Sequence, residues 1–539
     1  MPLLQVSPSP RVSFFRGPRF QFPALAGVAA AIAGVGAAEL TAALLAPTAG
    51  PIVAVGALLI DLAPAEVKDI MIAVFGTADK IALVVLIGLV LFVLALLAGV
   101  LEYRRPPSGR VLVVFAGAIA LFAALSRAGA SSFDALPSVV AMAAAAIVLT
   151  VLMTKLRAPG LLDGERPPGR LTLSGERTPD PEAGLDRRRF LAWTGVSAGV
   201  GFLALVGGQI LLAGTRAADS ARALFTLPTA SVTAAPIAAA ASFDLDGLSP
   251  IITPNADFYR IDTALQVPRI DPNTWRLKIT GMVENEVELS FADLLALPLE
   301  ESVTTLACVS NYVGGDLIGN AKWLGYPIRE LLARAKPTNG ADMVLSSSQD
   351  GFTAGTPIEA LTDERNAILA VGMNGEPLPL EHGYPVRMVV PGLYGYVSAT
   401  KWVVELKVTR FDQEQGYWTP RGWSELGPIK LQSRIDVPRA GAPLSGGPIT
   451  VAGVAWSQHV GVSGVEVQID DGGWEPATLA DAISIDTWRQ WMYTWDATSG
   501  GHTVRVRATD AEGRVQTAST ADVAPDGATG HHSISVNVS

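Results

Sequence analysis

Apolar residues are concentrated in the first 215 positions of this chain, where they form long runs with few charged residues. A helix that crosses a membrane needs about 20 mainly apolar residues. The runs that approach or reach this length cover residues 22–46, 81–101, 111–126, 136–153 and 190–214. The pattern therefore predicts a four-span transmembrane region in residues 1–157 and a fifth transmembrane span at 190–214.

Charged residues in the connections between these runs alternate in sign. Basic residues precede the first run, separate the second from the third, and separate the fourth from the fifth, at Arg11, Arg16, Arg19, Arg104, Arg105, Arg110 and from Lys155 to Arg189. The other connections carry mainly acidic residues, at Asp61, Glu66, Asp69, Asp79 and Asp134. Because cytoplasmic connections are enriched in Lys and Arg, we expect a multi-pass protein of the cell membrane with a cytoplasmic N-terminus. Everything after Gly214 is then expected outside the cytoplasm.

Two features of the apolar runs need separate interpretation. Glu39 interrupts the first run, either as a functional residue or, as we favour, at a position near the membrane interface. Residues 51–60 are apolar but too short to span a membrane, and we expect an outer loop there.

Three arginines, Arg187 to Arg189, stand directly before the fifth run and are followed by Phe190 and Leu191. This arrangement resembles the twin-arginine export signal, which serves proteins that are already folded. The alternative is a simple basic anchor for the fifth span. Residues 158–189 are then a cytoplasmic linker that carries the motif, and residues 215–250, rich in Ala, Ser and Thr, are an outer linker.

Short alternating runs replace the long apolar ones after residue 250. Residues 275–279, 367–371 and 386–390 alternate like strands. Ser290 followed by Asp293 predicts a capped helix over residues 290–297, and residues 328–334 predict another. The pattern indicates an α+β domain in residues 251–425.

The last part of the chain, residues 426–539, has the pattern of an all-β domain. Residues 449–456, 465–469, 491–495 and 502–508 alternate like strands, and D-D-G-G at 470–473 marks a turn. About seven short strands at regular spacing predict a β-sandwich of the immunoglobulin-like type.

Composition excludes some partners and cofactors. The net charge is -10, whereas a nucleic-acid-binding protein needs a basic face, so no nucleic acid is expected as a partner. None of the five histidines lies in an apolar run, which excludes a membrane haem held by two histidines of this chain. The single cysteine, Cys308 in T-L-A-C-V-S-N, cannot form an internal disulfide. It is either a metal ligand or a small buried apolar residue.

Four sequence blocks favour the metal ligand. They are T-P-N-A-D-F-Y-R-I-D (253–262), C-V-S-N with I-G-N-A-K-W-L-G (308–311 and 318–325), M-N-G-E-P-L-P-L-E-H-G-Y-P-V-R-M-V-V-P-G (373–392) and G-Y-V-S-A-T-K-W (395–402). In this order and spacing they resemble the molybdenum-cofactor domain of the sulfite oxidase family, which includes the bacterial periplasmic sulfoxide-reductase branch. The C-terminal stretch resembles the immunoglobulin-like dimerisation domain of the same family. The first 250 residues lie outside the resemblance.

The resemblance implies one cofactor, a Mo-molybdopterin with a single pyranopterin, whose molybdenum is held by the soft thiolate of Cys308. The residues that it assigns to cofactor binding are Asn255, Phe258, Tyr259, Asn311, Ser348, His382, Arg387, Ser398, Ala399, Thr400 and Lys401. Ser398 to Lys401 are expected at the phosphate end. Arg387 has a plainer interpretation as an outward charge on a strand. The plainer interpretation of His382 is a turn residue, and that of Lys401 is part of a solvated face.

The substrate pocket departs from the family pattern. Arg260 and Lys322 are expected, with Cys308, as the catalytic residues, but Lys322 stands where the family has an arginine and offers a point charge instead of a fork of donors. Phe352 aligns with a family tyrosine and cannot donate a hydrogen bond. We therefore expect a neutral or singly charged oxo substrate.

The resemblance implies a membrane-anchored molybdopterin-dependent oxidoreductase that cycles Mo(VI) and Mo(IV) and exchanges one oxygen atom with a small oxo substrate outside the cytoplasm. Alternatives are a sulfite oxidase proper and a cofactor-free exported binding protein on the same scaffold. The chain has no cysteine cluster for an iron–sulfur centre. A separate electron-transfer partner is therefore implied, either a cytochrome, a flavoprotein or a quinone-linked protein. The C-terminal domain is expected either to form a homodimer or to cover the cofactor domain.

Overall fold

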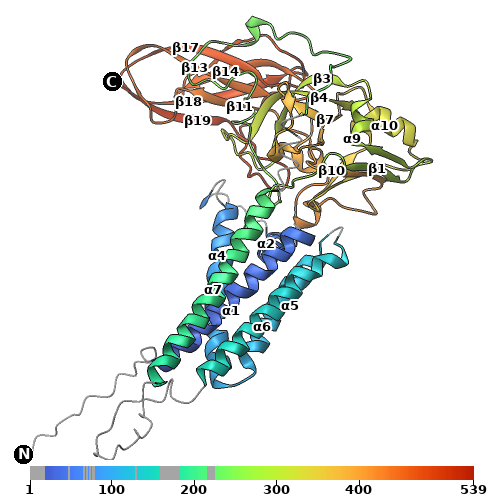
Figure 1. Ribbon diagram of the computed structural model, residues 1–539. Helices are drawn as coiled ribbons and strands as arrows, with labels where there is room; N and C mark the ends of the chain where they lie inside the picture. The colour runs from blue at the N-terminus through green and yellow to red at the C-terminus, as the bar shows by residue number, and fades with distance from the viewer. Residues whose placement is uncertain are drawn as a thin grey trace, which may run out of the picture. The chain divides into compact units, whose positions relative to one another are not determined.

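Helices make up the first of the two units into which the chain divides, Met1–Thr215, and strands make up most of the second, Arg216–Ser539 (Figure 1). The computed structural model describes residues 18–46, 49–64, 67, 71, 74–75, 79–127, 130–157, 182–214, 222 and 225–539. Most of the expected cytoplasmic linker, residues 158–181, lies outside the described residues, as do Arg11, Arg16, Glu66 and Asp69.

The helices of the first unit coincide with the predicted apolar runs. They are α1 (Pro18–Leu45), α2 (Pro51–Leu62), α4 (Asp79–Arg104), α5 (Ser108–Leu125), η2 (Ser132–Ala135), α6 (Leu136–Leu156) and α7 (Glu182–Gly214). Among the described residues, five segments are long and apolar enough to cross a membrane, at Gln21–Leu45, Lys80–Arg104, Ser108–Leu125, Ser132–Leu156 and Arg188–Leu211. The segment expected as an outer loop forms the short helix α2, which packs its Ala54 with Ala123 and Ala124 of α5.

Helix α1 is the central element of this bundle (Figure 1). Three of its glycines stand directly against neighbouring helices: Gly27 against α4, Gly34 against α6 and Gly36 against α7. A Cβ atom at Gly34 would lie 2.8 Å from the Cβ of Ala145, and at Gly36 it would collide with the backbone of Gly201. Small residues permit this close approach of helix backbones.

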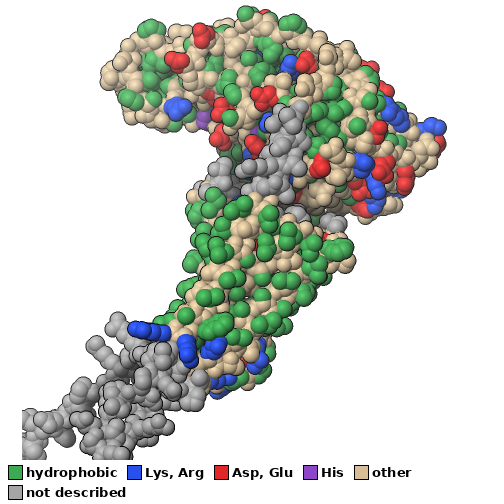
Figure 2. Space-filling view, in the orientation of Figure 1, with side chains coloured by type: hydrophobic (Ala, Val, Ile, Leu, Met, Phe, Trp, Pro, Cys, Tyr) green, Lys and Arg blue, Asp and Glu red, His purple; other side chains and the backbone are tan. Residues whose placement is uncertain are grey.

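The contact between α1 and α7 also buries a carboxylate. Glu39 of α1 is 3% exposed, and its Oε2 accepts a hydrogen bond of 3.2 Å from Gln209 Nε2 of α7. Helix α7 begins at Glu182, so Arg188 and Arg189 lie on its first turns, where both are exposed. Figure 2 shows Lys and Arg side chains gathered at the end of the bundle where α7 begins.

The α+β domain predicted for residues 251–425 contains one mixed sheet and one antiparallel sheet. One has the order β2-β1-β10-β5-β6, with bounds Val287–Ser290, Arg276–Gly281, Val403–Thr409, Met343–Ser348 and Thr353–Pro357. The other has the order β3-β4-β7-β8, with bounds Glu300–Ala307, Ile318–Pro327, Ile368–Met373 and Glu376–Pro377, and β9 (Arg387–Val389) pairs with β7. The strands predicted at residues 275–279, 367–371 and 386–390 are β1, β7 and β9.

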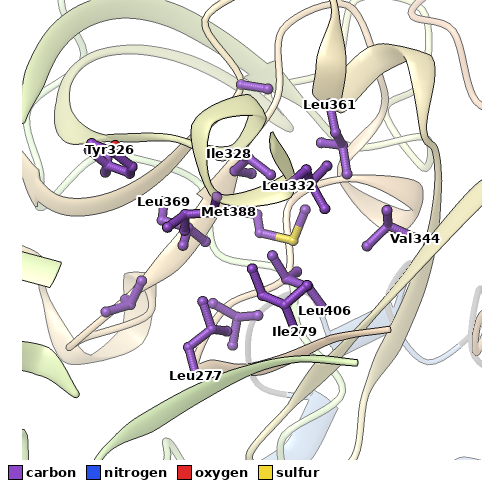
Figure 3. Packing of buried hydrophobic residues seen from close by; sticks show 14 of the residues in the cluster. Leu277, Ile279, Tyr326, Ile328, Leu332, Val344, Leu361, Leu369, Met388 and Leu406 are labelled. Carbon is purple, nitrogen blue, oxygen red and sulfur yellow. The ribbon is translucent and has the colours of Figure 1, made fainter. Parts of the chain in front are cut away.

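Short helices cover these sheets. Helix α9 (Phe291–Leu295) begins with the predicted capping box, in which Ser290 Oγ accepts from Asp293 N and Asp293 Oδ2 accepts from Ser290 N. The predicted helix at residues 328–334 is α10 (Ile328–Ala335), and α11 (Glu359–Thr362) lies near it. Figure 3 shows Ile328 and Leu332 of α10 over Ile279 of β1, in the core between helix and sheet.

The predicted β-sandwich is confirmed. Its sheets have the orders β11-β13-β17-β16 and β12-β19-β18-β14-β15. In chain order the strands are β11 (Gln432–Val437), β12 (Pro443–Leu444), β13 (Gly447–Trp456), β14 (Val462–Ile469), β15 (Trp474–Pro476), β16 (Thr478–Leu479), β17 (Arg489–Ala497), β18 (Gly500–Asp510) and β19 (His532–Val538). A buried core with Val451, Val467 and Trp491 fills the space between the two sheets.

The sandwich packs directly on the α+β domain. A loop of the sandwich covers the outer edge of β3: Thr305 N donates to Asp486 O at 3.0 Å, and Trp488 N donates to Thr305 Oγ1 at 2.8 Å. Ala307 and Ile318, where β3 ends and β4 begins, share an apolar cluster with Trp456 of the sandwich. The C-terminal domain is therefore fixed on the strand that leads into Cys308.

Candidate active site

Cys308 follows β3 directly and opens a tight loop that returns to β4. Its backbone N–H donates to Leu317 O at 2.9 Å, and its carbonyl accepts from Asn311 N at 3.1 Å. The side-chain Oδ1 of Asn311 accepts from Leu317 N at 2.9 Å, so this predicted cofactor residue holds the cysteine loop together. The thiol is 9% exposed. Burial raises the pKa of Cys308, and hydrogen bonds from Ser310 act in the opposite direction.

The sandwich supports the same loop from outside. Arg434 Nη1 of β11 donates to Gly315 O at 2.8 Å, and its Nε pairs with Asp436 at 2.7 Å. Gly314, whose φ is +79°, stands against the ring of His532 with no room for a side chain. The same imidazole is fixed by the sandwich, since its Nδ1 accepts from Ile435 N at 3.0 Å. Apart from the pair of Arg434 with Asp436, sequence spacing gave no signal for these contacts, because their partners lie at least 97 positions apart in the chain.

Arg387 is a buried cation without a carboxylate partner among the described residues. It is 5% exposed, and its guanidinium donates to His382 O at 3.2 Å, Met388 O at 3.3 Å and Ala399 O at 3.5 Å. Its Cζ lies 5.1 Å from the ring centre of Trp323. Burial lowers the pKa of Arg387 to about 10. A buried charge without a counter-ion is costly, which indicates an anionic ligand here.

Lys401 and Arg260 share one carboxylate. Lys401 Nζ and Arg260 Nε lie 2.7 Å and 2.8 Å from Asp262 Oδ2, and Lys401 also donates to Glu381 O at 3.0 Å. Burial lowers the pKa of Lys401 to about 8, and Asp262 acts against this shift. Arg260 and Lys401 are paired with Asp262, and Arg387 is a third cation of the site. The resulting excess of positive charge suits a phosphate group.

His382 is held neutral in this cationic surrounding. Burial, followed by the charges of Arg387 and Lys401, lowers the pKa of His382 to about 3. Its Nε2 lies 3.3 Å from Asn255 O, so this nitrogen carries the proton and Nδ1 is an acceptor. Phe258 packs edge-on to the imidazole, with ring centres 5.5 Å apart.

Tyr259 connects the cysteine to the cationic group. Its ring stacks on Phe258 at 5.2 Å. Burial and the nearby Cys308 raise the pKa of Tyr259, whereas Arg387 acts to lower it. Cys308 and Arg387 are therefore both close to Tyr259. Contacts and electrostatic effects place Cys308, Tyr259, Arg387, His382 and Lys401 near one another, and we call these five residues the cofactor row.

Several other predicted cofactor residues shape the surrounding loops. Ser398 Oγ donates to Tyr394 O at 2.9 Å, and Thr400 Oγ1 lies 2.7 Å from Ser346 Oγ. Ala399 contributes its carbonyl to Arg387. Ser348, at the end of β5, pairs with Val403 and accepts from Asp350 N at 3.4 Å. The hydroxyls of Ser398, Thr400 and Ser348 are thus bonded within the protein, and these residues position the loops around the cofactor row.

Lys322 is not brought to Cys308. It lies on β4 opposite Val303 and forms an ion pair of 2.7 Å with Glu301. Ala307, next to Cys308, pairs with Ile318, four residues earlier on β4 and about 13 Å away along the strand. Lys322 instead lines a separate cavity of about 380 Å³ together with Asn374. Of the two cations expected beside the metal ligand, Lys322 is paired with Glu301, and Arg260 is paired with Asp262, the carboxylate that also binds Lys401.

Two residues of the site were missed by the sequence analysis. Asp262 is the counter-ion of Lys401, and Trp323 forms the floor beneath Arg387. Asp262 lies in the block at 253–262 and Trp323 in the block at 318–325, so the resemblance could have indicated both as site residues. In the part of the chain that the structure describes, no group of three or more His, Cys, Asp or Glu side chains is placed to hold a metal ion.

Comparison with known proteins identifies the domain that carries this row. The family described as "Oxidoreductase molybdopterin binding domain" matches residues 264–418, and "Bacterial Ig domain" matches residues 432–506. The "Uncharacterized oxidoreductase YuiH" of Bacillus subtilis (strain 168) is 32% identical over 157 residues, which are 29% of this chain and 76% of that protein. The chain belongs to the molybdopterin-binding oxidoreductase family.

Sulfite oxidases are further relatives within this family. Mitochondrial sulfite oxidase of Mus musculus is 30% identical over 288 residues, which are 45% of this chain and 52% of that protein. The Homo sapiens protein is 31% identical over 271 residues, 42% of this chain and 49% of that protein. The chain thus spans about half the length of these relatives. A solved structure, the sulfane dehydrogenase SoxCD from Paracoccus pantotrophus, covers 50% of this chain and 75% of that chain at 24% identity, with a TM-score of 0.45.

The residues of the cofactor row fit the molybdopterin cofactor that this family implies. The cofactor row combines a buried thiol, Cys308, with the cations Arg387 and Lys401. A soft thiolate suits molybdenum, and guanidinium and ammonium groups suit a phosphate. The excess of positive charge around Arg387 is explained if an anionic group binds there.

Proposed function

We propose that this protein is a membrane-anchored oxidoreductase that uses molybdopterin to exchange one oxygen atom with a small oxo substrate outside the cytoplasm. The observation that carries the proposal is the cofactor row, in which a buried thiol and a buried guanidinium without a carboxylate partner among the described residues both lie near Tyr259. A cofactor-free binding protein has no use for a buried cation of this kind, because its burial lowers stability.

Each residue of the row has a defined task in this proposal. Cys308 would hold molybdenum through its sulfur, and Arg387 and Lys401 would neutralise the phosphate. Because His382 Nε2 is directed to Asn255 O, its Nδ1 would be free to accept a hydrogen bond from the pterin. When bound, the cofactor supplies two-electron oxygen-atom transfer.

The charges around Cys308 favour a neutral or singly charged substrate, such as a sulfoxide or an N-oxide. Arg260 is paired with Asp262 and Lys322 with Glu301. Phe352, whose ring is 5.8 Å from that of Tyr417, offers no hydrogen-bond donor. A dianion such as sulfite binds best where several cations converge.

Sulfite oxidation is the second candidate, and the sequence similarity to mitochondrial sulfite oxidases favours it. Parallel assays with sulfite, a dialkyl sulfoxide and an aromatic N-oxide separate the two candidates. Turnover of sulfite at rates typical of sulfite oxidases, with none for the neutral substrates, would reject our substrate assignment.

The membrane topology belongs to the same proposal. Five apolar helices and the basic residues at one end of the bundle support a cytoplasmic N-terminus and a cofactor domain outside. The arginine run before the fifth span supports export of a folded, cofactor-loaded domain. A separate cytochrome, flavoprotein or quinone-linked protein exchanges electrons with the cofactor. The second unit could form a homodimer through the sandwich, whose other face already covers the cysteine loop.

Molybdenum analysis of the full chain tests the proposal. We expect one molybdenum per chain in the purified protein and a visible absorption band from the thiolate–metal bond. Cys308→Ser should lower the metal content and remove the band, whereas Ser310→Ala, which keeps the thiol, should retain both. Wild-type protein without molybdenum, or a Cys308→Ser variant with an unchanged spectrum, contradicts the proposal.

A further inference from the structure

Two helices of the first unit, α6 and α7, carry surface stripes that combine apolar side chains with a cation. On α6, Ile147, Val151 and Lys155 follow one another at intervals of four residues, which places them on one face of the helix. Ile147 and Val151 are exposed, and Lys155 is half-buried in the last turn. The stripe on α6 is therefore apolar over two turns and ends in a cation.

Helix α7 carries a matching stripe that runs in the opposite chain direction. Arg189 and Trp193 are four residues apart and therefore share a face of the helix. Val196 and Val200 continue this face at steps of three and four residues, and all four side chains are exposed. The cation comes first on this helix, at the end of the bundle where Figure 2 shows Lys and Arg side chains, and the apolar residues follow.

The cationic ends of the two stripes are in contact. Lys155 Nζ lies 4.6 Å from the ring centre of Trp193, which is the geometry of a cation–π interaction. Phe190, the neighbour of Arg189, is buried and meets the ring of Phe22 of α1 edge-on, with ring centres 5.7 Å apart. This contact fixes the rotation of α7 and keeps Arg189 at the surface. We call Lys155, Arg189 and Trp193 the α6–α7 basic site.

No carboxylate among the described side chains neutralises this site. Glu102 of α4 is the only carboxylate with a described side chain at this end of the bundle. It is already engaged by Arg110, whose Nε and backbone N donate to its two oxygens at 2.9 Å and 3.0 Å. Lys155 and Arg189 form no ion pair within the described part of the chain. The α6–α7 basic site therefore offers two positive charges to an anion.

We propose that the α6–α7 basic site binds the phosphate of an anionic phospholipid, whose acyl chains lie along the apolar stripes of α6 and α7. The proposal rests on the membrane placement proposed above and is independent of the molybdenum chemistry. Basic residues close to a membrane surface attract anionic headgroups, and a Trp at the same level is typical of the membrane interface. A zwitterionic lipid carries its own cation and gains less from the two positive charges. Bound there, the lipid joins α7, which leads to the cofactor domain, to the four-span region.

Titration with lipids of defined charge tests the site. The full chain is purified in a neutral detergent, and native mass spectrometry measures its affinity for phosphatidylglycerol and for phosphatidylcholine. We expect phosphatidylglycerol to bind more tightly, and Lys155→Gln to weaken its binding about fivefold, the effect of one cation lost at a membrane surface. The matched control is Arg105→Gln, which removes an equal charge from an exposed position at the same end, directly after α4. We expect it to bind phosphatidylglycerol like the wild type.

Two further measurements sharpen the test. Trp193→Leu, which removes the ring beneath the ammonium group, should also weaken the binding of phosphatidylglycerol. Glycerophosphoglycerol, the headgroup without acyl chains, should bind far more weakly than the lipid, because it cannot use the apolar stripes. Thermal unfolding verifies that each variant is folded.

Several outcomes overturn the lipid site. Equal weakening in Lys155→Gln and Arg105→Gln would show a diffuse attraction by the basic end of the bundle instead of a site. Equal affinity for the two lipids, an unchanged affinity of Lys155→Gln, or headgroup binding as tight as that of the lipid would each contradict it as well. None of these measurements involves molybdenum, so a wrong assignment of the catalysed reaction leaves their result intact.

Discussion

The ammonium group of Lys401 lies 2.7 Å from the carboxylate of Asp262, although the two residues are 139 positions apart in the chain. This contact joins the first sequence block of the cofactor domain to the last. Because burial lowers the pKa of Lys401 to about 8 while Asp262 opposes the shift, the pair keeps the lysine charged at neutral pH.

Asp262→Asn should therefore make cofactor retention more sensitive to pH. A lysine is charged below its pKa and neutral above it, so its attraction for a phosphate is lost as the pH rises through that pKa. Without Asp262 the pKa falls further below 8. If the pKa falls by about one unit, the charged fraction of Lys401 at pH 7.5 falls about threefold, and we expect about threefold less bound pterin than in the wild type. Retention is measured by pterin fluorescence after dialysis at pH 6.5, 7.5 and 8.5. Equal losses at all three pH values would refute the role of Lys401.

Arg387→Met should separate cofactor binding from folding. Hydrogen bonds to charged groups contribute about 1.5–3 kcal/mol, so pterin retention should fall by tenfold or more. The stability of the cofactor-free protein should change by less than about 1 kcal/mol, because the lost bonds to three carbonyls are offset by removal of a buried charge.

Arg387→Lys is the matched variant for this experiment. It keeps the charge but not the fork of donors, so its pterin retention should be intermediate. The measurements are pterin content and denaturant unfolding of cofactor-free protein. Normal pterin content in Arg387→Met would show that the guanidinium does not face the cofactor.

Thr305→Val should loosen the sandwich from the α+β domain. The Thr305 hydroxyl donates to Asn320 Oδ1 at 3.0 Å and accepts from Trp488 N at 2.8 Å, and its loss leaves both groups buried without this partner. We expect a loss of about 1–3 kcal/mol in the free energy of unfolding. The neighbouring Thr304 hydroxyl is buried and has no partner among the described residues, so Thr304→Val should be neutral or stabilising. Unfolding followed by tryptophan fluorescence compares the two variants, and equal losses would contradict the interface.

Gly201→Val should disrupt the contact between helices α1 and α7. A Cβ atom at Gly201 would lie 2.6 Å from Ala33 Cα, and overpacking of this kind costs about 1–3 kcal/mol. Gly207, six residues later on α7, has no described atom within 4 Å of its Cβ position, so Gly207→Val should have little effect. The midpoint of thermal aggregation in detergent distinguishes the two. A larger effect at Gly207 would mean that a different face of α7 is packed.

Local features of the fold could be predicted from the sequence. The five long helices follow from the length and hydropathy of single segments, and the capping box at Ser290 and Asp293 acts within four residues. The strands β1 and β7 follow from alternation. Helix α2 was expected as a loop because an apolar run of ten residues is compatible with either structure, and packing on α5 decides between them.

The candidate site could be predicted as a set of residues but not as an arrangement. The four blocks named Cys308, Arg387 and Lys401 as members of one site, and the structure places Cys308 and Arg387 near Tyr259 and Lys401 near His382. They could not show that Lys322 pairs with Glu301, because that depends on the register of β3 and β4. Nor could they show that Arg434 reaches Gly315, a contact across 119 positions.

Because Cys308 is the only cysteine in 539 residues, its reactivity can report which molecules have received the cofactor. If the sulfur of Cys308 is bonded to molybdenum, an alkylating reagent added after mild denaturation marks only those molecules that were never loaded. Each such chain gains the mass of a single adduct, and no other thiol confuses the spectrum. The ratio of two peaks then gives the loaded fraction in any preparation, even one too scarce for metal analysis.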